Sequence, residues 1–159
     1  MKKVLFFLLL VTASIAIAQE QFDKYIATLR ADMSADKTAL VTAAMNLSGE
    51  ASNKFWPVYR DYDHELAKLG DRRVALIKEY AASFDSLTDA KANSIMKGFF
   101  KNHHDRLGLL EKYYGKMEKE VGAVTAAKFV QVENQISSYV ELQIASNLPL
   151  IKKVGEGKK

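Results

Sequence analysis

The chain has 159 residues, with 23 basic and 19 acidic side chains, no cysteine, two prolines and a formal net charge of +4. This length suits one domain, or at most two. Without cysteine the chain can form no disulfide framework, zinc ribbon, iron–sulfur cluster or thiol nucleophile. The small positive surplus argues against a nucleic-acid partner, because a phosphate backbone is bound by a clustered basic face.

The first eighteen residues have the pattern of a cleavable export signal. Met1-Lys2-Lys3 gives a positive start, residues 4–15 are apolar apart from two hydroxyl residues, and Ala16-Ile17-Ala18 is a small-x-small cleavage site. The apolar run is shorter than the roughly 20 residues that span a bilayer. We therefore expect cleavage after Ala18 and a periplasmic protein with no integral membrane segment.

The rest of the chain has the periodicity of helices. Apolar residues recur at alternating spacings of three and four, and no stretch alternates with period two. The pattern predicts an all-α fold, an elongated four-helix protein with a long central hairpin. We expect helices near residues 20–45, 48–82, 88–121 and 125–147. Residues 19–150 would form a single domain, and the lysine-rich residues 151–159 a disordered tail.

The first two expected helices each carry an apolar stripe. In the first helix the stripe comprises Phe22, Ile26, Leu29, Met33, Leu40 and Ala44. In the second it comprises Phe55, Tyr59, Tyr62, Leu66, Leu69, Leu76 and Tyr80. Arg73 alone breaks this second seam, and its register runs undisturbed through Pro57 and Gly70. We predict one continuous second helix, about 50 Å long and bent at Pro57 because proline removes a backbone hydrogen bond.

The third and fourth helices continue the same pattern after a turn expected at Phe84 to Leu87. The third stripe comprises Ile95, Phe99, Leu107, Leu110, Tyr114, Met117 and Val121. The fourth comprises Phe129, Val132, Ile136, Tyr139 and Ile144. Pro149 then forbids continuation of the helix. Such stripes predict one buried face on each helix.

Three of the expected helices start with an apolar residue followed by a hydroxyl residue. The pairs are Leu47-Ser48, Leu87-Thr88 and Val124-Thr125. A serine or threonine oxygen at such a position can accept a hydrogen bond from a free backbone N–H of the first turn. The apolar residue before it can pack on that turn. We therefore interpret the three pairs as helix N-caps.

These helix starts resemble the degenerate Leu-Thr-x-x-Gln elements of the Spy/CpxP family of periplasmic proteins, although none of the three ends in Gln. The resemblance covers roughly residues 47–150 of an exported, cysteine-free, helical chain. Two further blocks, Phe55-Trp56-Pro57-Val58-Tyr59 and Val130-Gln131-Val132-Glu133-Asn134, are similar to a related group of bacterial proteins. The family resemblance implies a cradle-like homodimer that binds unfolded proteins or acts in envelope stress sensing.

Motifs that carry enzymatic chemistry are missing from the sequence. It contains no glycine-rich phosphate loop, no G-x-S-x-G elbow and no H-E-x-x-H pair. A catalytic site would have to use carboxylates, tyrosines or lysines, which are spread along every expected helix as in solvated faces. We expect no enzyme and no cofactor.

The three histidines are the candidate metal ligands, because imidazole suits zinc and copper. If the hairpin pairs residues whose numbers sum to about 171, His64 lies about one turn from His103 and His104. Adjacent helical residues point about 100° apart, so these two histidines cannot both face His64. We expect no metal site, and keep a metal-binding (zinc or copper) stress-response protein as the alternative function.

The central helices hold more aromatic side chains than one narrow seam can bury. As a hypothetical client-binding surface we single out Trp56, Tyr59, Tyr62, Phe99 and Phe100. Aromatic rings provide contact area and neighbouring basic residues attract acidic segments. The alternative is that these rings form the core or a dimer interface. The function we expect is that of an ATP-independent periplasmic chaperone or envelope-stress adaptor whose partners are unfolded or envelope proteins.

Overall fold

The structure, a computed structural model, describes residues 36–151. The chain divides into two compact units after Ala44. Residues 36–45 are helical, and the expected start of this helix near residue 20 lies outside the described residues, as do the leader and residues 152–159. No strand occurs between residues 36 and 151, so the all-α expectation is confirmed.

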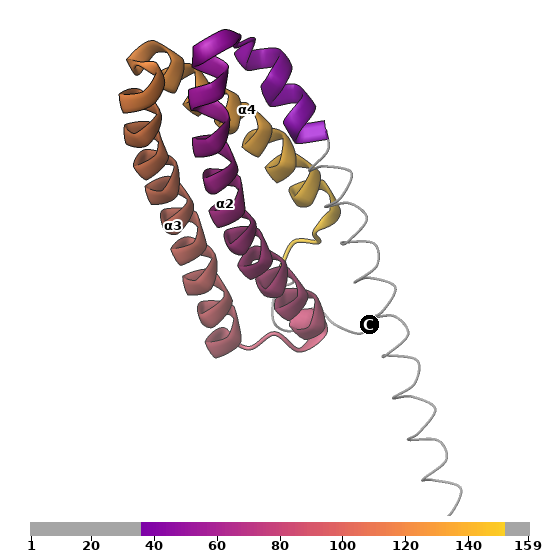
Figure 1. Cartoon of the computed structure of the whole chain (residues 1–159). Coiled ribbons are helices and arrows are strands. Elements are labelled where there is room, and N and C mark those ends of the chain that lie inside the picture. The colour runs from indigo at the N-terminus through magenta and orange to yellow at the C-terminus, as the bar shows by residue number, and fades with distance from the viewer. Residues whose placement is uncertain (1–35, 152–159) are drawn as a thin grey trace, which may run out of the picture. The chain divides into compact units, whose positions relative to one another are not determined.

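The second unit contains three long helices. They are α2 (Gly49–Ser83), α3 (Asp89–Val121) and α4 (Ala123–Asn147), with a short 3-10 turn at Phe84–Ser86 between the first two. The predicted bounds differ from these by at most two residues. α2 and α3 lie side by side as the predicted long hairpin (Figure 1). None of the helices in the described part of the chain is long and apolar enough to cross a membrane.

α2 is continuous through both of its helix-breaking residues. It passes Pro57 and Gly70 without interruption over 35 residues, which correspond to about 52 Å at 1.5 Å per residue. Its buried residues are Phe55, Tyr59, Tyr62 and Leu69. Their three/four spacing places them on one face, so the predicted seam forms the inner side of the hairpin.

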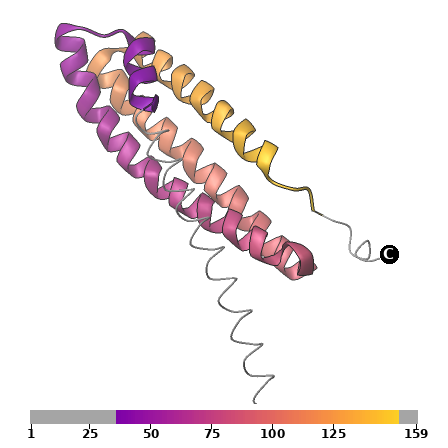
Figure 2. The same cartoon turned by 90° about the vertical axis from the view of Figure 1, so that its right-hand side faces the viewer.

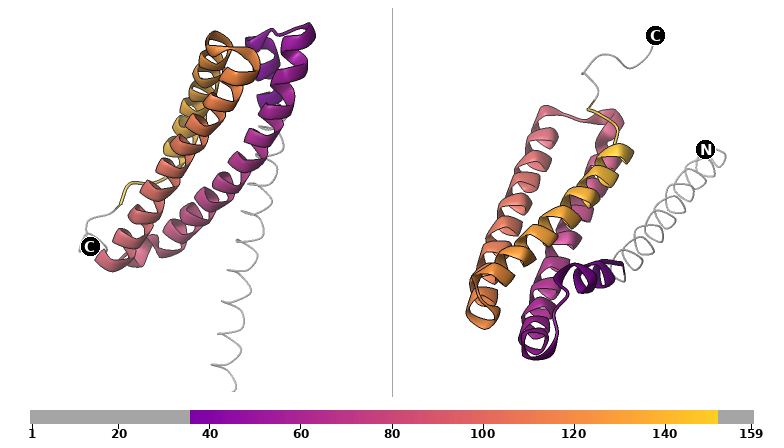
Figure 3. Two further views of the ribbon diagram at one scale, coloured as in Figure 1. Left: turned by 60° about the vertical axis from the view of Figure 1, so that its left-hand side comes forward. Right: turned by 90° about the horizontal axis from the view of Figure 1, so that it is seen from above.

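α4 packs across the hairpin and not along a single helix. Gly122, with φ of 84°, reverses the chain between α3 and α4 in one residue, a conformation that suits glycine. α4 begins against α3 and then crosses toward the last turns of α2 (Figures 2 and 3). There the Tyr80 hydroxyl donates a hydrogen bond to the carbonyl oxygen of Pro149 at 2.7 Å.

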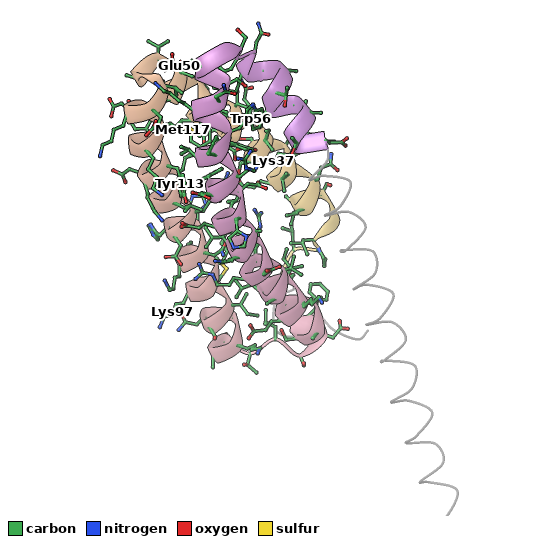
Figure 4. All side chains as sticks on the ribbon, in the orientation of Figure 1. Lys37, Glu50, Trp56, Lys97, Tyr113 and Met117 are labelled. Carbon is green, nitrogen blue, oxygen red and sulfur yellow. The ribbon has the colours of Figure 1, made fainter. Side chains whose placement is uncertain are left out.

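The core of this unit is an aromatic cluster at the end of the hairpin away from the turn. Tyr62 of α2 contacts Tyr113 of α3 and Phe129 of α4, with ring centroids 5.5 and 5.1 Å apart. Met117 continues the cluster and is fully buried. Tyr113 and Met117 lie on the side of α3 that faces α2, whereas Lys97 points away from it (Figure 4).

The predicted stripes of α3 and α4 were wrong at three positions. Phe99, Leu107 and Tyr139 were expected inside, but 41%, 61% and 63% of their surfaces are exposed. Leu109 and Tyr113 are buried instead. The oblique path of α4 leaves the first half of α3 uncovered, and a straight helix drifts by about 20° per heptad from a strict seven-residue stripe.

Candidate functional site

The α2 part of the hypothetical client surface belongs to the core. Tyr59 and Tyr62 are 3% and 0% exposed, so they cannot contact a client while the unit is folded, and their assignment to the client surface was wrong. Trp56 is half-buried and packs edge-on against Phe55 and Tyr59 at centroid distances of 5.2 and 5.5 Å. The rings face inward because the seam they share is the contact surface of α2.

Glu133 is a buried acidic residue that sequence reasoning did not single out. Its carboxylate accepts a hydrogen bond from the Tyr59 hydroxyl at 3.1 Å and another from the Tyr62 hydroxyl at 2.9 Å. Burial, followed by the nearby negative charge of Glu133, raises the pKa of both hydroxyls above the usual value, so both remain protonated donors. The available signal was that Glu133 stands one helical turn after Phe129 and next to Val132, on the side of the predicted apolar stripe.

The α3 part of the hypothetical surface is exposed. Phe99 and Phe100 are 41% and 56% exposed, and Met96 and Leu107 are exposed beside them. Residues at positions 96, 100 and 107 lie on one side of a helix, with 99 at its edge. We call these four side chains the α3 apolar face. Lys97 is exposed next to it.

Only one of the three predicted N-caps forms as expected. The Thr88 hydroxyl accepts a hydrogen bond from the backbone N–H of Lys91 at 3.2 Å. Ser48 occupies the N-cap position of α2, but its side chain makes no capping bond. Thr125 lies inside α4, because Gly122 is the N-cap of that helix. Leu47, Leu87 and Val124 precede these residues, and Val124 is almost fully exposed, so it packs on no first turn.

A charged groove of about 660 Å³ lies between α2 and α3, with Leu69 and Leu109 among its lining residues. The Lys112 ammonium contacts the Glu65 carboxylate at 2.8 Å. This hydrogen bond, with a second from the Tyr113 hydroxyl, lowers the pKa of Glu65. Lysine and arginine donors likewise lower the pKa of Asp105 in the groove wall. The groove is therefore an ion-paired surface whose carboxylates are already held by cations.

The histidines do not form a metal site with their neighbours. His64, His103 and His104 are all exposed, and His104 alone lines the groove. Among residues 36–151 no group of three histidine, aspartate or glutamate side chains is placed to hold a metal ion. The proximity of His64 to His103 and His104 that the hairpin pairing suggested therefore does not produce a coordination geometry among the described residues.

The part of the hypothetical surface that remains accessible is the α3 apolar face. The α3 apolar face offers aromatic and aliphatic area beside a lysine, while the tyrosine–glutamate contacts beneath α4 are sealed in the core. Phe99 and Phe100 were named in the hypothetical client surface, although Phe99 was also placed on the inner stripe of the helix. Leu107 was expected inside, and Met96 was not singled out. Similarity to known proteins adds no assignment, since the chain matches no protein-family model, no curated protein and no solved structure.

Proposed function

We propose that this protein is an exported, ATP-independent chaperone-like or envelope-stress adaptor protein that binds unfolded or partner proteins without catalysis. The observation that carries the proposal is the α3 apolar face. Phe100 and Leu107, both more than half exposed, stand one and three turns along the helix from Met96. Single exposed apolar residues are ordinary, but four of them on one face of a helix, with the exposed His103 between Phe100 and Leu107, favour a binding surface.

The chemistry of this face suits an unfolded polypeptide. Unfolded chains expose apolar side chains, and burying apolar surface contributes about 25 cal/mol per Å². Aromatic rings supply large areas for such contacts. Lys97 beside the face would attract acidic residues of the bound chain. This recognition depends on apolar area and charge and therefore requires no defined sequence in the client.

Two features of the sequence support the cellular setting of the proposal. The pattern of residues 1–18 is that of an export signal. The helix starts resemble those of the Spy/CpxP family, whose members act in the periplasm on unfolded proteins or in stress sensing. We propose that the same class of partner binds here, and that the protein works as a homodimer.

The test compares two polar substitutions on the face with one outside it. Phe100→Gln and Leu107→Gln, combined, remove apolar area from exposed positions and keep a good helix former. Leu142→Gln on α4 is the matched control, since Leu142 is also exposed, at 67%. Suppression of aggregation of a reduced, unfolded model protein is measured with the thermal midpoint. We expect the double variant to bind at least tenfold more weakly, a loss of about 1.4 kcal/mol, and to retain its midpoint.

Three results would contradict this proposal. A wild-type protein that suppresses no aggregation at severalfold excess removes the chaperone function itself. A loss of suppression in Leu142→Gln as large as in the double variant removes the assignment to α3. A fall in the thermal midpoint of the double variant by many degrees gives these residues a structural role instead.

A further inference from the structure

Arg73 is the residue that interrupts the apolar seam of α2, and the structure places it in the interior. Its side chain is 20% exposed, and its closest carboxylate contact joins Nη1 to Oε1 of Glu141 at 3.7 Å, beyond hydrogen-bond distance. Its Nε is buried and has no hydrogen-bond partner. Burial is the main cause that lowers the pKa of Arg73. Buried polar groups in proteins are normally hydrogen-bonded, so a buried N–H without an acceptor indicates that an acceptor could bind here.

Arg106 of α3 is a second arginine whose charge reaches Arg73. The Asn102 side chain donates a hydrogen bond to the Leu69 carbonyl at 2.9 Å, which fixes these two residues opposite each other. Arg73 follows Leu69 by four residues, and Arg106 follows Asn102 by four. The helices are antiparallel and helical side chains point back toward their own N-termini, so we expect both guanidinium groups to extend toward the level of Asn102. The charge of Arg106 accordingly contributes to the lowered pKa of Arg73.

The carboxylates of α4 do not satisfy this pair. Glu133 accepts hydrogen bonds from two tyrosines, and Glu141 makes only long contacts, at 3.5 Å to the Ser137 hydroxyl and 3.7 Å to Arg73. No hydrogen bond or ion pair joins Arg106 to another residue within the described part of the chain. Two partly buried positive charges thus share one region in which Glu141, 3.7 Å from Arg73, is the nearest counter-charge. Partly buried like charges are costly unless they are fully compensated.

We propose that Arg73 and Arg106 bind one small oxyanion, of the phosphate or carboxylate class, between α2, α3 and α4. The Nε–H and one Nη–H of Arg73 form a fork that matches two oxygens of such a group. The Phe99 ring, 6.0 Å from the guanidinium carbon, flanks the fork. The ligand enters beside the second half of α4, where Glu141 is 42% exposed. This site shares Phe99 with the edge of the proposed client surface, but anion binding by the arginines does not depend on client binding.

The test follows the arginine Nε–H resonances of the ¹⁵N-labelled full chain while inorganic phosphate or acetate replaces chloride at constant ionic strength. We expect a saturable shift of the Arg73 resonance and a thermal midpoint about 4 °C or more above that in chloride. Arg73→Gln and Arg106→Gln should remove the thermal effect. Arg72→Gln is the matched control, because Arg72 is adjacent in sequence but pairs with Asp105 in the outer groove. A response to phosphate alone assigns the phosphate class, and a response to acetate assigns a carboxylate.

Glu141→Gln separates this proposal from a simple ion pair within the chain. Removing the competing carboxylate should raise phosphate affinity about fivefold if the arginines bind an external anion. An equal fall in the midpoint in both salts, without a phosphate effect, would make Glu141 the sole partner of Arg73 and overturn the proposal. The absence of a saturable Arg73 shift in the wild-type protein overturns it as well, even if Arg73→Gln fails to fold. So does an equal loss of the effect in Arg72→Gln, which would indicate general screening.

Discussion

The carboxylate of Glu133 joins α4 to α2 through two tyrosine hydroxyls, although the backbones of these helices do not approach closely. The contact is buried, and a hydrogen bond to a charged group is stronger in a medium of low dielectric constant than in water. Because burial raises the pKa of Tyr59 and Tyr62, both remain donors at every physiological pH. The long tyrosine side chains thus bridge the distance that separates α2 from α4.

Removing one of these donors should weaken the fold measurably. We expect Tyr62→Phe to lower the free energy of unfolding by about 1.5–3 kcal/mol, the range for hydrogen bonds to charged groups. Tyr139→Phe is the control, since Tyr139 is 63% exposed. Urea unfolding followed by circular dichroism gives both values. Equal and small losses in the two variants would show that the Glu133 contact contributes little.

The sequence predicted on which side of the helix these residues lie, but it did not predict which residues they contact. The three/four spacing placed Tyr59 and Tyr62 on the inner stripe of α2, and it marked Arg73 as the exception. It could not place Glu133 opposite residues 71 and 74 positions earlier. Periodicity defines which side of a helix is apolar, whereas the crossing of α4 over the hairpin decides which side chains meet.

Some helix ends can be predicted from the few residues around them, and others cannot. The turn after α2 and the Thr88 cap were predictable, because a hydroxyl residue followed by a polar first turn is a local signal. The start of α4 was predicted two residues late, since Gly122 both ends α3 and caps α4. Gly122 has a positive φ, which few other residues adopt, and this allows a reversal with a single residue.

The two N-cap hydroxyls should therefore differ in their effect on stability. Thr88→Ala removes the bond from the Lys91 backbone and should cost about 1 kcal/mol of unfolding free energy. Ser48→Ala removes no capping bond and should cost only a few tenths of a kcal/mol. Thermal and urea unfolding of both variants provide the comparison. A loss in Ser48→Ala as large as in Thr88→Ala would contradict the difference between these two caps.

At the scale of the whole molecule we expect some of the exposed apolar residues to be covered by a second copy of the chain. Narrow helical faces bury little apolar surface within one chain. Association with a second copy is the simplest way to bury more of it. We expect a homodimer at tens of micromolar in sedimentation velocity experiments. A wild-type protein that sediments only as a monomer would contradict this expectation.

The same measurement on Phe100→Gln tests whether dimer and client share a surface. We expect this variant to remain dimeric, because the α3 apolar face is assigned to the client. Conversion to a monomer would place the dimer contact on α3, and the client assignment of that face would then be lost. Leu142→Gln, measured in parallel, tests α4 in the same way.

Close backbone contacts in the second unit form only between helices that follow one another in the chain. Loops of this kind close quickly, and topologies dominated by local contacts fold on microsecond to millisecond timescales. A chain that emerges N-terminus first can complete the α2–α3 hairpin before α4 is available. Docking of α4 is then the last step, and it completes the burial of Tyr59 and Tyr62 by placing Phe129 and Glu133 against them. Tyrosine fluorescence would therefore report the final stage of folding.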